Sequence, residues 1–462
     1  MPTAPLPNRA GRLADVALFG RAYGALHPGL RRYLTSAQWR GVLDRLEREA
    51  LAATHHCQFW LAFSRATAAV RCGHSYVSPF NMGKLWTGVM EARADRLPFH
   101  FRWIDRQMIV TKPLADHPAL VRGTRVSTID GEADGSLLAR MLPLARADGG
   151  NDFKRIANME VREGGSRWEA FDVMWALGRT PAPTSARLLL EPPRADAVLV
   201  DMPLLGLDSR GAATKDERRG WVHRHVGDAT ILTMPDWTTY NTKWDWRSWL
   251  TGVIDETVAR GSKRLVVDLR GNEGGEDCGD PILARMIDAP LTEAGAVRRV
   301  RFRETPADMR PALDTWDPGF HTLGKDAAGP DADGLYTLPA RAADGLAPAQ
   351  GQRLRAKLIV LIDSANSSAT FQFAQKVRRN GLGLLLGEPT GGNQRGINGG
   401  AYFFLRLPES RLEVDLPLIG YFPAGDPPDA GLMPDIMVPT TRRTIVRGED
   451  PQMVRALDLP LA

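Results

Sequence analysis

The sequence is poor in cysteine and has no long hydrophobic run. Its three cysteines, Cys57, Cys72 and Cys278, form no Cys-x-x-Cys pair, so they indicate neither a disulfide framework nor a zinc ribbon. No stretch of about 18 apolar residues occurs, and the first residues lack the apolar region of a signal peptide. We therefore expect a soluble chain without a membrane span, whether or not a leader has been removed.

Charge and the common motifs exclude further classes of protein. The formal charge is +5, from 59 basic and 54 acidic residues, and the basic residues are scattered rather than collected in one block. Dedicated nucleic-acid binding is therefore not expected. The sequence also contains no G-x-S-x-G elbow, no phosphate-binding P-loop and no H-E-x-x-H zinc helix. Any catalytic group must come from other segments.

Hydrophobic periodicity divides the 462 residues into regions of different pattern. Apolar residues spaced three and four apart predict helices over residues 12–72, with Thr35 as an N-cap. Shorter alternating runs follow, and then a strand, an amphipathic helix over 244–261 and the buried strand "RLVVDLR", which together predict a βαβ unit. We expect an N-terminal helical domain, a β-rich domain, an α/β core with a surface insertion at 304–350, and a C-terminal tail, at 1–80, 81–214, 215–445 and 446–462 respectively.

Serines follow an apolar run in the segment "KLIVLIDSANSSATFQFAQ", residues 357–375. The run predicts a strand that ends at Asp363, and the next residues predict a tight turn and a helix that begins near Ser368. A hydroxyl there lies at a helix N-terminus, whose unpaired N–H groups can hold a negative oxygen, which suits a serine nucleophile. The alternative is that Ser364, Ser367 and Ser368 only cap the helix and fill the turn.

A glycine-rich turn is the second candidate. In "VVDLRGNEGGEDCGD" a buried strand ends near Asp268 and Arg270 and is followed by Gly271, Gly274 and Gly275. Paired glycines after a parallel strand let backbone N–H groups approach a ligand closely, as an oxyanion hole requires. The alternative is a simple turn between a strand and a helix.

These two segments together resemble a known family. "RLVVDLRGNEGG" and "VLIDSANSSATFQFAQKVRRNGLGLLLGEPTGG" are similar to the two signature segments of the tail-specific, or C-terminal processing, serine peptidases, and they occur in the same order. The late segment "GLMPDIMV" is similar to the closing Gly-x-x-Pro-Asp-x-x-Val segment of that family. The resemblance covers residues 225–440 and implies an α/β (α+β) protein whose protease core holds a ClpP/crotonase-like βαβ sheet.

The resemblance also implies roles for single residues. It places the nucleophile at Ser368 and the oxyanion hole at the backbone N–H groups of Gly274 or Gly275 and of Ala369. In the C-terminal processing branch a lysine serves as the base, and its position falls on Asn393 here. An amide cannot accept a proton, so a Ser-Lys dyad is not expected.

The base is therefore sought among the nine histidines. The turn "VRCGHSYVSP" is similar to the place where the tricorn-like branch of the family carries its catalytic histidine, which selects His74. Histidine has an ordinary pKa of about 6.5 and can take the proton of a serine at neutral pH. The alternative is a histidine that caps a helix or packs in a domain interface. We set aside His55, His56 and Cys57 as a metal site, because adjacent residues of a helix point in different directions.

A histidine base usually needs a partner that fixes its tautomer. Ser75, adjacent to His74, and the carboxylates Glu388, Asp426 and Asp429 are candidates for this orienting role, and the sequence does not choose among them. The segment "LVRGTRVSTIDGEADGSLLARM" resembles, more weakly, the PDZ-like domain of many family members, which holds a peptide by strand addition.

The sequence thus predicts a serine endopeptidase that cleaves polypeptides through an acyl-enzyme, with Ser368 as nucleophile and His74 as base. This chemistry requires no metal or organic cofactor, and neither nucleic acid nor a membrane span is expected. The resemblance implies the bacterial periplasm, cell envelope or exterior as the compartment. The alternative is a non-catalytic ligand- or peptide-binding protein on the same scaffold, as in the retinoid-binding repeats that share this fold. The sequence predicts no oligomeric state.

Overall fold

The computed structural model describes residues 6–81, 83–165, 168–179, 181–210, 220–292, 296–340 and 345–460. Its contacts divide the chain into two compact units, each made of three segments. The expected domain border at 214/215 lies outside the described residues, and the division at 80/81 stays a prediction. Unit 1 comprises Met1–Ala213, Val297–Pro339 and Arg395–Asp426, and unit 2 comprises Thr214–Ala296, Ala340–Gln394 and Pro427–Ala462.

The N-terminal part of unit 1 is helical, as the spacing of its apolar residues predicts. The predicted cap is confirmed, because the Thr35 hydroxyl accepts a hydrogen bond from the Gln38 N–H and the Thr35 N–H donates to Gln38 Oε1. Phe19, Tyr23 and Phe63 are fully buried in the core of these helices. The helices are α1 (Arg9–Leu26), α2 (Leu30–Tyr33), α3 (Ser36–Ala52), α4 (His56–Ala69) and α5 (Lys84–Glu91).

An antiparallel sheet with short helices forms the middle of unit 1. Its strand order is β1-β2-β3-β5-β6, with β4 paired to β3 through a turn at Asp130 and Gly131. Alternate residues such as Leu188 and Leu190 are buried with residues of α6 and α8. A PDZ-like function of this region stays a prediction. The elements are β1 (Phe99–Ile104), β2 (Gln107–Pro113), β3 (Arg125–Ile129), β4 (Glu132–Ala133), α6 (Asp134–Met141), η1 (Leu142–Leu144), α7 (Asp152–Asn158), α8 (Ala170–Leu177), β5 (Ser185–Glu191) and β6 (Val198–Pro203).

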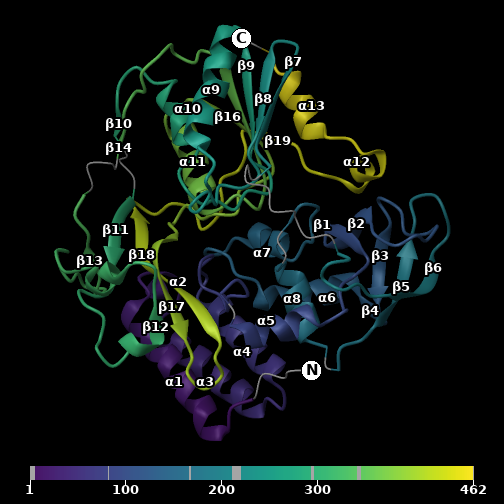
Figure 1. Cartoon of the computed structure of the whole chain (residues 1–462), viewed down its shortest axis with the longest axis vertical. Helices are drawn as coiled ribbons and strands as arrows, with labels where there is room; N and C mark the ends of the chain where they lie inside the picture. Colours follow the sequence, from purple (N-terminus) through teal and green to yellow (C-terminus); the bar gives the residue numbers. More distant parts are fainter. Residues whose placement is uncertain are drawn as a thin grey trace. The chain divides into compact units, whose positions relative to one another are not determined.

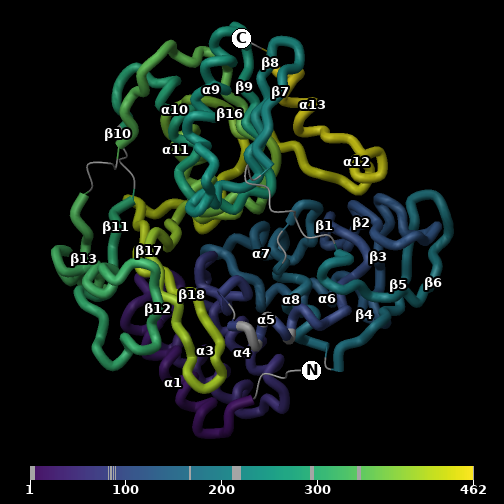
Figure 2. The backbone as a smooth tube through the Cα atoms, in the orientation of Figure 1, coloured from purple at the N-terminus to yellow at the C-terminus, as the bar shows by residue number. Residues whose placement is uncertain are grey.

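A long hairpin of β17 (Asn398–Arg406) and β18 (Glu413–Pro423) also belongs to unit 1. Its two strands pair antiparallel and are joined by the segment "PESR". The hairpin lies beside α1 (Figure 1, Figure 2), and the Tyr23 hydroxyl donates a hydrogen bond to the Asp415 carbonyl oxygen at 3.1 Å. Neighbouring elements of unit 1 are β11 (Ala296–Val300), η2 (Arg310–Ala312), β12 (Leu313–Asp314), η3 (Pro318–Thr322) and β13 (Tyr336–Thr337).

Unit 2 is built on a sheet with the strand order β19-β16-β15-β9-β8-β7. All these strands are parallel except the edge strand β7, which is antiparallel to β8. Figure 1 shows α9, α10 and α11 on one side of this sheet and α13 on the other. Because both faces are covered, the inner strands are continuous apolar runs. The elements are β7 (Val222–Val226), β8 (Ala229–Thr233), α9 (Trp246–Ala259), β9 (Arg264–Asp268), α10 (Asp280–Ala284), β10 (Leu291–Thr292), β14 (Gly345–Leu346), β15 (Lys357–Ile362), α11 (Ser368–Arg379), β16 (Gly383–Gly387), β19 (Ile436–Met437), α12 (Arg442–Arg447) and α13 (Pro451–Leu457).

The βαβ unit predicted for this part of the chain is confirmed. Strands β8 and β9 are parallel, and the amphipathic helix α9 between them buries one side, including Trp246, Leu250 and Val253. The segment expected as a tail contains α13, whose Met453 and Ala456 pack into the core on one face of the sheet. Among the described residues, no helix has both the length and the apolar character needed to cross a bilayer.

Candidate active site

Ser368 occupies a strained turn between β15 and α11 in unit 2. Its φ is 52°, in the left-handed region that residues other than glycine rarely adopt, although it is the first residue of the helix. The residue is half-buried, and its hydroxyl has no hydrogen-bond partner among the described residues. Strain of this kind persists where the surroundings fix it, and it is common at functional sites. The turn thus presents an unpaired hydroxyl at a helix N-terminus.

The two neighbouring serines are held differently. Ser364 and Ser367 are only 7% and 9% exposed. Ser367 is the N-cap residue of α11, but its side chain makes no capping bond, and its hydroxyl donates instead to the Glu273 carbonyl oxygen at 3.1 Å. The helix-capping interpretation is therefore wrong for Ser367. Ser368 is the most exposed of the three serines.

Gly274 packs directly against the serine turn. A Cβ atom at Gly274 would lie 2.9 Å from Ser368 Cβ, 2.9 Å from the Ala369 nitrogen and 2.8 Å from the Ser367 carbonyl oxygen. The φ angles of Gly274 and Gly275 are 103° and 141°, which other residues adopt only with strain. Gly274 is therefore required by the close approach of the two turns, whereas a Cβ atom at Gly275 would collide with the backbone of Trp237.

Two backbone N–H groups near Ser368 are available as donors. The Gly274 N–H already donates to Asn272 Oδ1 at 2.8 Å. The N–H groups of Gly275 and Ala369 have no partner within the part of the chain that the structure describes. Since Gly275 follows Gly274 and Ala369 follows Ser368, both donors belong to the backbone that meets at the serine turn. Such a pair suits the binding of an oxyanion.

Two buried asparagines, which sequence reasoning missed, hold the turns together. Asn366 Nδ2 donates to the Asn272 carbonyl oxygen at 3.0 Å, and the Asn366 carbonyl oxygen accepts from the Gly391 N–H at 2.7 Å. Asn272 Nδ2 donates in turn to the Met234 carbonyl oxygen at 2.7 Å. Asparagine is common in turns for many reasons, so its presence alone gave no signal of this role.

Arg270 fixes the end of β9. It donates to both carboxylate oxygens of Asp268, at 2.8 and 2.6 Å, and to both carboxylate oxygens of Asp450, at 2.8 Å each. Burial alone would lower the pKa of Arg270, but the hydrogen bonds that it donates to Asp268 and Asp450 raise it. The guanidinium therefore stays charged and ties the strand end to the residue that caps α13.

His74 lies in unit 1, in the turn that follows α4. The residue is half-buried. A carboxylate oxygen of Asp148, the Cys72 Sγ and a ring nitrogen of His74 all lie within 4.8 Å of one another. Asp148 also accepts a hydrogen bond from the Gly73 N–H at 2.9 Å. Burial raises the pKa of Asp148 to about 6, against the opposing effect of the Gly73 bond.

The orienting residue expected next to His74 has another partner. Ser75 is fully buried, and its hydroxyl lies 3.1 Å from His27 Nε2. The carboxylate beside His74 is instead that of Asp148, which sequence reasoning missed because nothing near it in the sequence marks it. His74 belongs to unit 1 and Ser368 to unit 2, so their pairing stays a prediction.

The other expected carboxylates have partners of their own. Glu388 accepts a hydrogen bond from the Thr440 N–H at 2.8 Å. Asp429 accepts one from Asn393 Nδ2 at 2.7 Å, and Asn393 is fully buried. Asp426 is 89% exposed and belongs to unit 1. Asp429 therefore lies beside Asn393.

Three groups of side chains in the described residues bring metal-ligating atoms within 4.8 Å: Cys72 with His74 and Asp148, His223 with His225 and Glu256, and His55 with His56 and Cys57. The expectation that the last group points apart is wrong. Helix α4 begins only at His56, so His55 is its N-cap, and the two rings lie 4.0 Å apart. The His55 Nδ1 nevertheless accepts a hydrogen bond from the Cys57 N–H at 3.3 Å.

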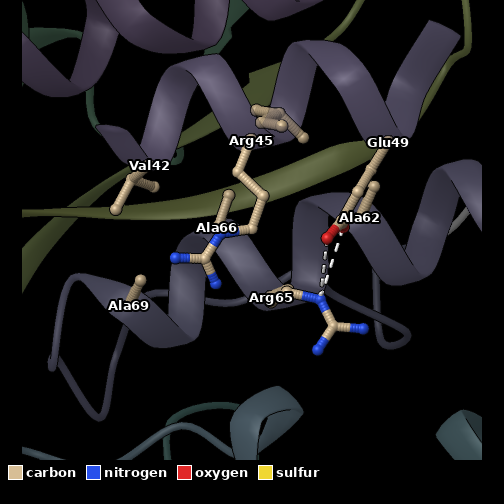
Figure 3. A pocket seen from close by; sticks show the side chains of 8 residues that line it. Val42, Arg45, Glu49, Ala62, Arg65, Ala66 and Ala69 are labelled. Carbon is tan, nitrogen blue, oxygen red and sulfur yellow. Dashed lines mark hydrogen bonds and ion pairs between the residues drawn. The ribbon is translucent and has the colours of Figure 1, made fainter. Parts of the chain in front are cut away.

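A hollow between α3 and α4 in unit 1 is lined by neither the candidate catalytic residues nor the metal-ligating groups (Figure 3). Its lining includes Val42, Ala62 and Ala66, and at its side Arg65 Nε lies 3.3 Å from a carboxylate oxygen of Glu49. The hollow offers no nucleophile, so the serine turn remains the candidate active site.

Comparisons with known proteins match the part of the chain that contains the serine turn. Residues 228–436 match the model of peptidase family S41. Two solved structures that resemble the chain are mature CPAF, with a TM-score of 0.64 and 13% identity over 95% of this chain and 94% of that one, and mature CPAF complexed with lactacystin, with a TM-score of 0.67 and 14% identity over 97% and 98%. At such identity the likeness concerns the fold. No curated protein matches the sequence. The matched segment contains both turns that meet at Ser368, so the chain carries a domain of peptidase family S41, the tail-specific serine peptidases.

Proposed function

We propose that this peptidase is a serine-type endopeptidase that cleaves polypeptides through an acyl-enzyme, with Ser368 as nucleophile and His74 as base. One observation carries the proposal: the strained turn at Ser368 presents an unpaired hydroxyl beside the unpaired N–H groups of Gly275 and Ala369. Polar groups left without partners in a rigid turn are typical of a site that awaits a substrate.

The proposed reaction follows from these groups. Ser368 Oγ attacks the carbonyl carbon of the scissile peptide bond, and its proton passes to His74. The N–H groups of Gly275 and Ala369 hold the negative oxygen while the imidazolium gives its proton to the leaving amine and the C–N bond breaks. Water then attacks the ester with the help of the same base and releases the acid product. Gly274 contributes by having no side chain, because its N–H is already engaged.

We assign the orienting role to Asp148. Its carboxylate lies within 4.8 Å of a ring nitrogen of His74, whereas the hydroxyl of Ser75 contacts His27. A carboxylate beside an imidazole fixes the tautomer of the ring and stabilises the imidazolium. Because burial raises the pKa of Asp148 to about 6, the group is ionised at neutral pH and becomes protonated in mild acid. We therefore expect the orienting effect to be lost below that pH.

Asn393 supports a histidine mechanism over a lysine mechanism. It is buried, donates to Asp429 and has no basic nitrogen. The absence of a lysine at position 393 also leaves one alternative, a peptide-binding protein that has the same scaffold but does not cleave peptides. The two readings differ in whether a bound peptide is cleaved.

Turnover of casein or of a labelled peptide library by the full chain tests the proposal. Ser368→Ala should remove cleavage while the far-ultraviolet circular dichroism is unchanged, and Ser364→Ala, in the same turn, is the matched control and should keep most of the activity. His74→Ala should lower kcat by roughly 100- to 10,000-fold. Asp148→Asn should lower kcat with little effect on KM. A folded His74→Ala variant that cleaves at the parental rate would leave the reaction without its base.

A further inference from the structure

Two histidines and a glutamate form a separate cluster in unit 2. His223 and His225 alternate along the edge strand β7, so their side chains lie on the same face of the sheet. Helix α9 lies over that face and carries Glu256. None of the three takes part in the proposed peptidase reaction.

Both imidazoles contact the same carboxylate. His223 Nε2 lies 3.0 Å from Glu256 Oε2, and His225 Nε2 lies 2.7 Å from Glu256 Oε1. The Glu256 carboxylate has no lysine or arginine partner in the described ranges of the chain. Two imidazole nitrogens and one carboxylate thus converge on one spot.

The second nitrogen of His225 also has a partner. His225 Nδ1 lies 3.1 Å from Thr230 Oγ1, and Thr230 Oγ1 lies 3.0 Å from Ser262 Oγ. Hydroxyl groups both donate and accept hydrogen bonds, so this chain serves either tautomer of the ring. Metal-bound imidazoles usually donate their other N–H to an oxygen, which fixes the ring. Thr230 is placed to accept that N–H.

We propose that His223, His225 and Glu256 form a binding site for a divalent first-row transition ion such as Zn²⁺, Ni²⁺ or Cu²⁺. Imidazole nitrogen and carboxylate oxygen are ligands that these ions prefer. The three ligand atoms lie within 4.8 Å of one another. Two atoms bound to one ion at about 2.1 Å lie at most about 4.2 Å apart, so small side-chain rotations close the site. The side chains are 27%, 19% and 47% exposed, which leaves a position for water or a fourth ligand.

This site is distinct from the peptidase site. Strand β7 is separated from β15 by β8 and β9. His225 pairs with Thr230 near the start of β8, whereas Ser368 follows the far end of the parallel strand β15. A bound ion ties the edge strand to α9 and stabilises unit 2, since it binds the folded form. The inference does not depend on the peptidase activity.

Tryptophan fluorescence gives a direct readout. The ring centre of His223 lies 5.6 Å from that of Trp249, which lies 5.5 Å from Trp244 and 6.0 Å from Trp221. Titration of the full chain with CuCl₂ should quench this emission to saturation at one ion per chain. Electron paramagnetic resonance of the Cu²⁺ form should show coupling to two imidazole nitrogens. ZnCl₂ should compete with Cu²⁺ and raise the unfolding temperature.

Variants locate the ion. His223→Asn, His225→Asn and Glu256→Gln should each weaken Cu²⁺ binding by at least about 100-fold, and Thr230→Val by about 10-fold. His117→Asn, a histidine of unit 1, is the control and should bind as the parent does. Circular dichroism checks the fold of each variant, and three separate substitutions guard against the failure of one. The proposal is overturned if the parent shows no saturable uptake, or if all three folded variants keep the parental affinity.

Discussion

Replacing Gly274 by alanine is expected to damage the serine turn more than it destabilises the fold. The new Cβ would lie 2.8–2.9 Å from three atoms of residues 367–369, and real Cβ contacts are almost never shorter than 3.0 Å. Two of these atoms are backbone atoms, which cannot rotate away. An ordinary contact of 3.4 Å therefore requires the two turns to separate by about 0.5 Å.

The cost of this change can be worked from two effects. Overpacking of this kind costs about 1–3 kcal/mol. Alanine at a φ of 103° adds about 1–3 kcal/mol of backbone strain. The free energy of unfolding should thus fall by about 2–6 kcal/mol. The displaced Ala369 N–H and Ser368 hydroxyl no longer match the transition state, so kcat should fall about 100-fold.

Gly381 provides a matched control in the same unit. Its φ is 60°, and a Cβ there meets nothing within 4 Å. Gly381→Ala should therefore cost only about 1–2 kcal/mol and leave kcat unchanged. Urea unfolding and steady-state cleavage of a labelled peptide measure both quantities. The reasoning is refuted if Gly274→Ala, shown to be folded, turns over as fast as Gly381→Ala.

Three further predictions concern charge and metal. Burial raises the pKa of Asp148 to about 6 from an ordinary 3.8, so its stabilising effect is complete below the ordinary value and is lost as the pH rises through the folded value. Between these two pKa values the parent should lose about 3 kcal/mol of unfolding free energy relative to Asp148→Asn, as measured by urea titration at each pH. If the difference in unfolding free energy between the two proteins does not change with pH, burial does not raise the pKa of Asp148. Asn393→Lys should not raise kcat/KM, because the ammonium would pair with Asp429 and stay charged, and a large gain in rate would argue against His74 as the base. EDTA should leave turnover unchanged, and loss of activity restored by Zn²⁺ would contradict a serine mechanism.

Local features were the ones that the sequence predicted well. The Thr35 cap, the buried side of α9 and the start of α11 at Ser368 depend on residues close together in the chain. The glycine pair was predicted as an oxyanion turn, but the sequence left open which N–H groups are free. That choice depends on the side chain of Asn272, which occupies the Gly274 N–H.

Contacts between distant segments were not predictable. Asp148 lies beside His74 only because the chain folds back to the helices after strands β1–β4. The hairpin of β17 and β18 joins the N-terminal helices through contacts such as that between Tyr23 and Asp415. Periodicity describes which face of an element is apolar, and it does not say which partner covers that face. The prediction for His55 was also wrong, because the sequence pattern does not distinguish the N-cap residue of a helix from a residue inside it.

The identity of the nucleophile is the central claim, and covalent labelling tests it most directly. The full chain should be treated with a fluorophosphonate, which modifies activated serine hydroxyls, and the modified residue mapped by peptide mass spectrometry. The account predicts one modified serine, Ser368, and peptide cleavage should be lost at the rate at which this serine is labelled. Both labelling and cleavage should be absent in Ser368→Ala. Modification of Ser364 or Ser367, or a chain that cleaves peptides while Ser368 stays unmodified by the reagent, would contradict it.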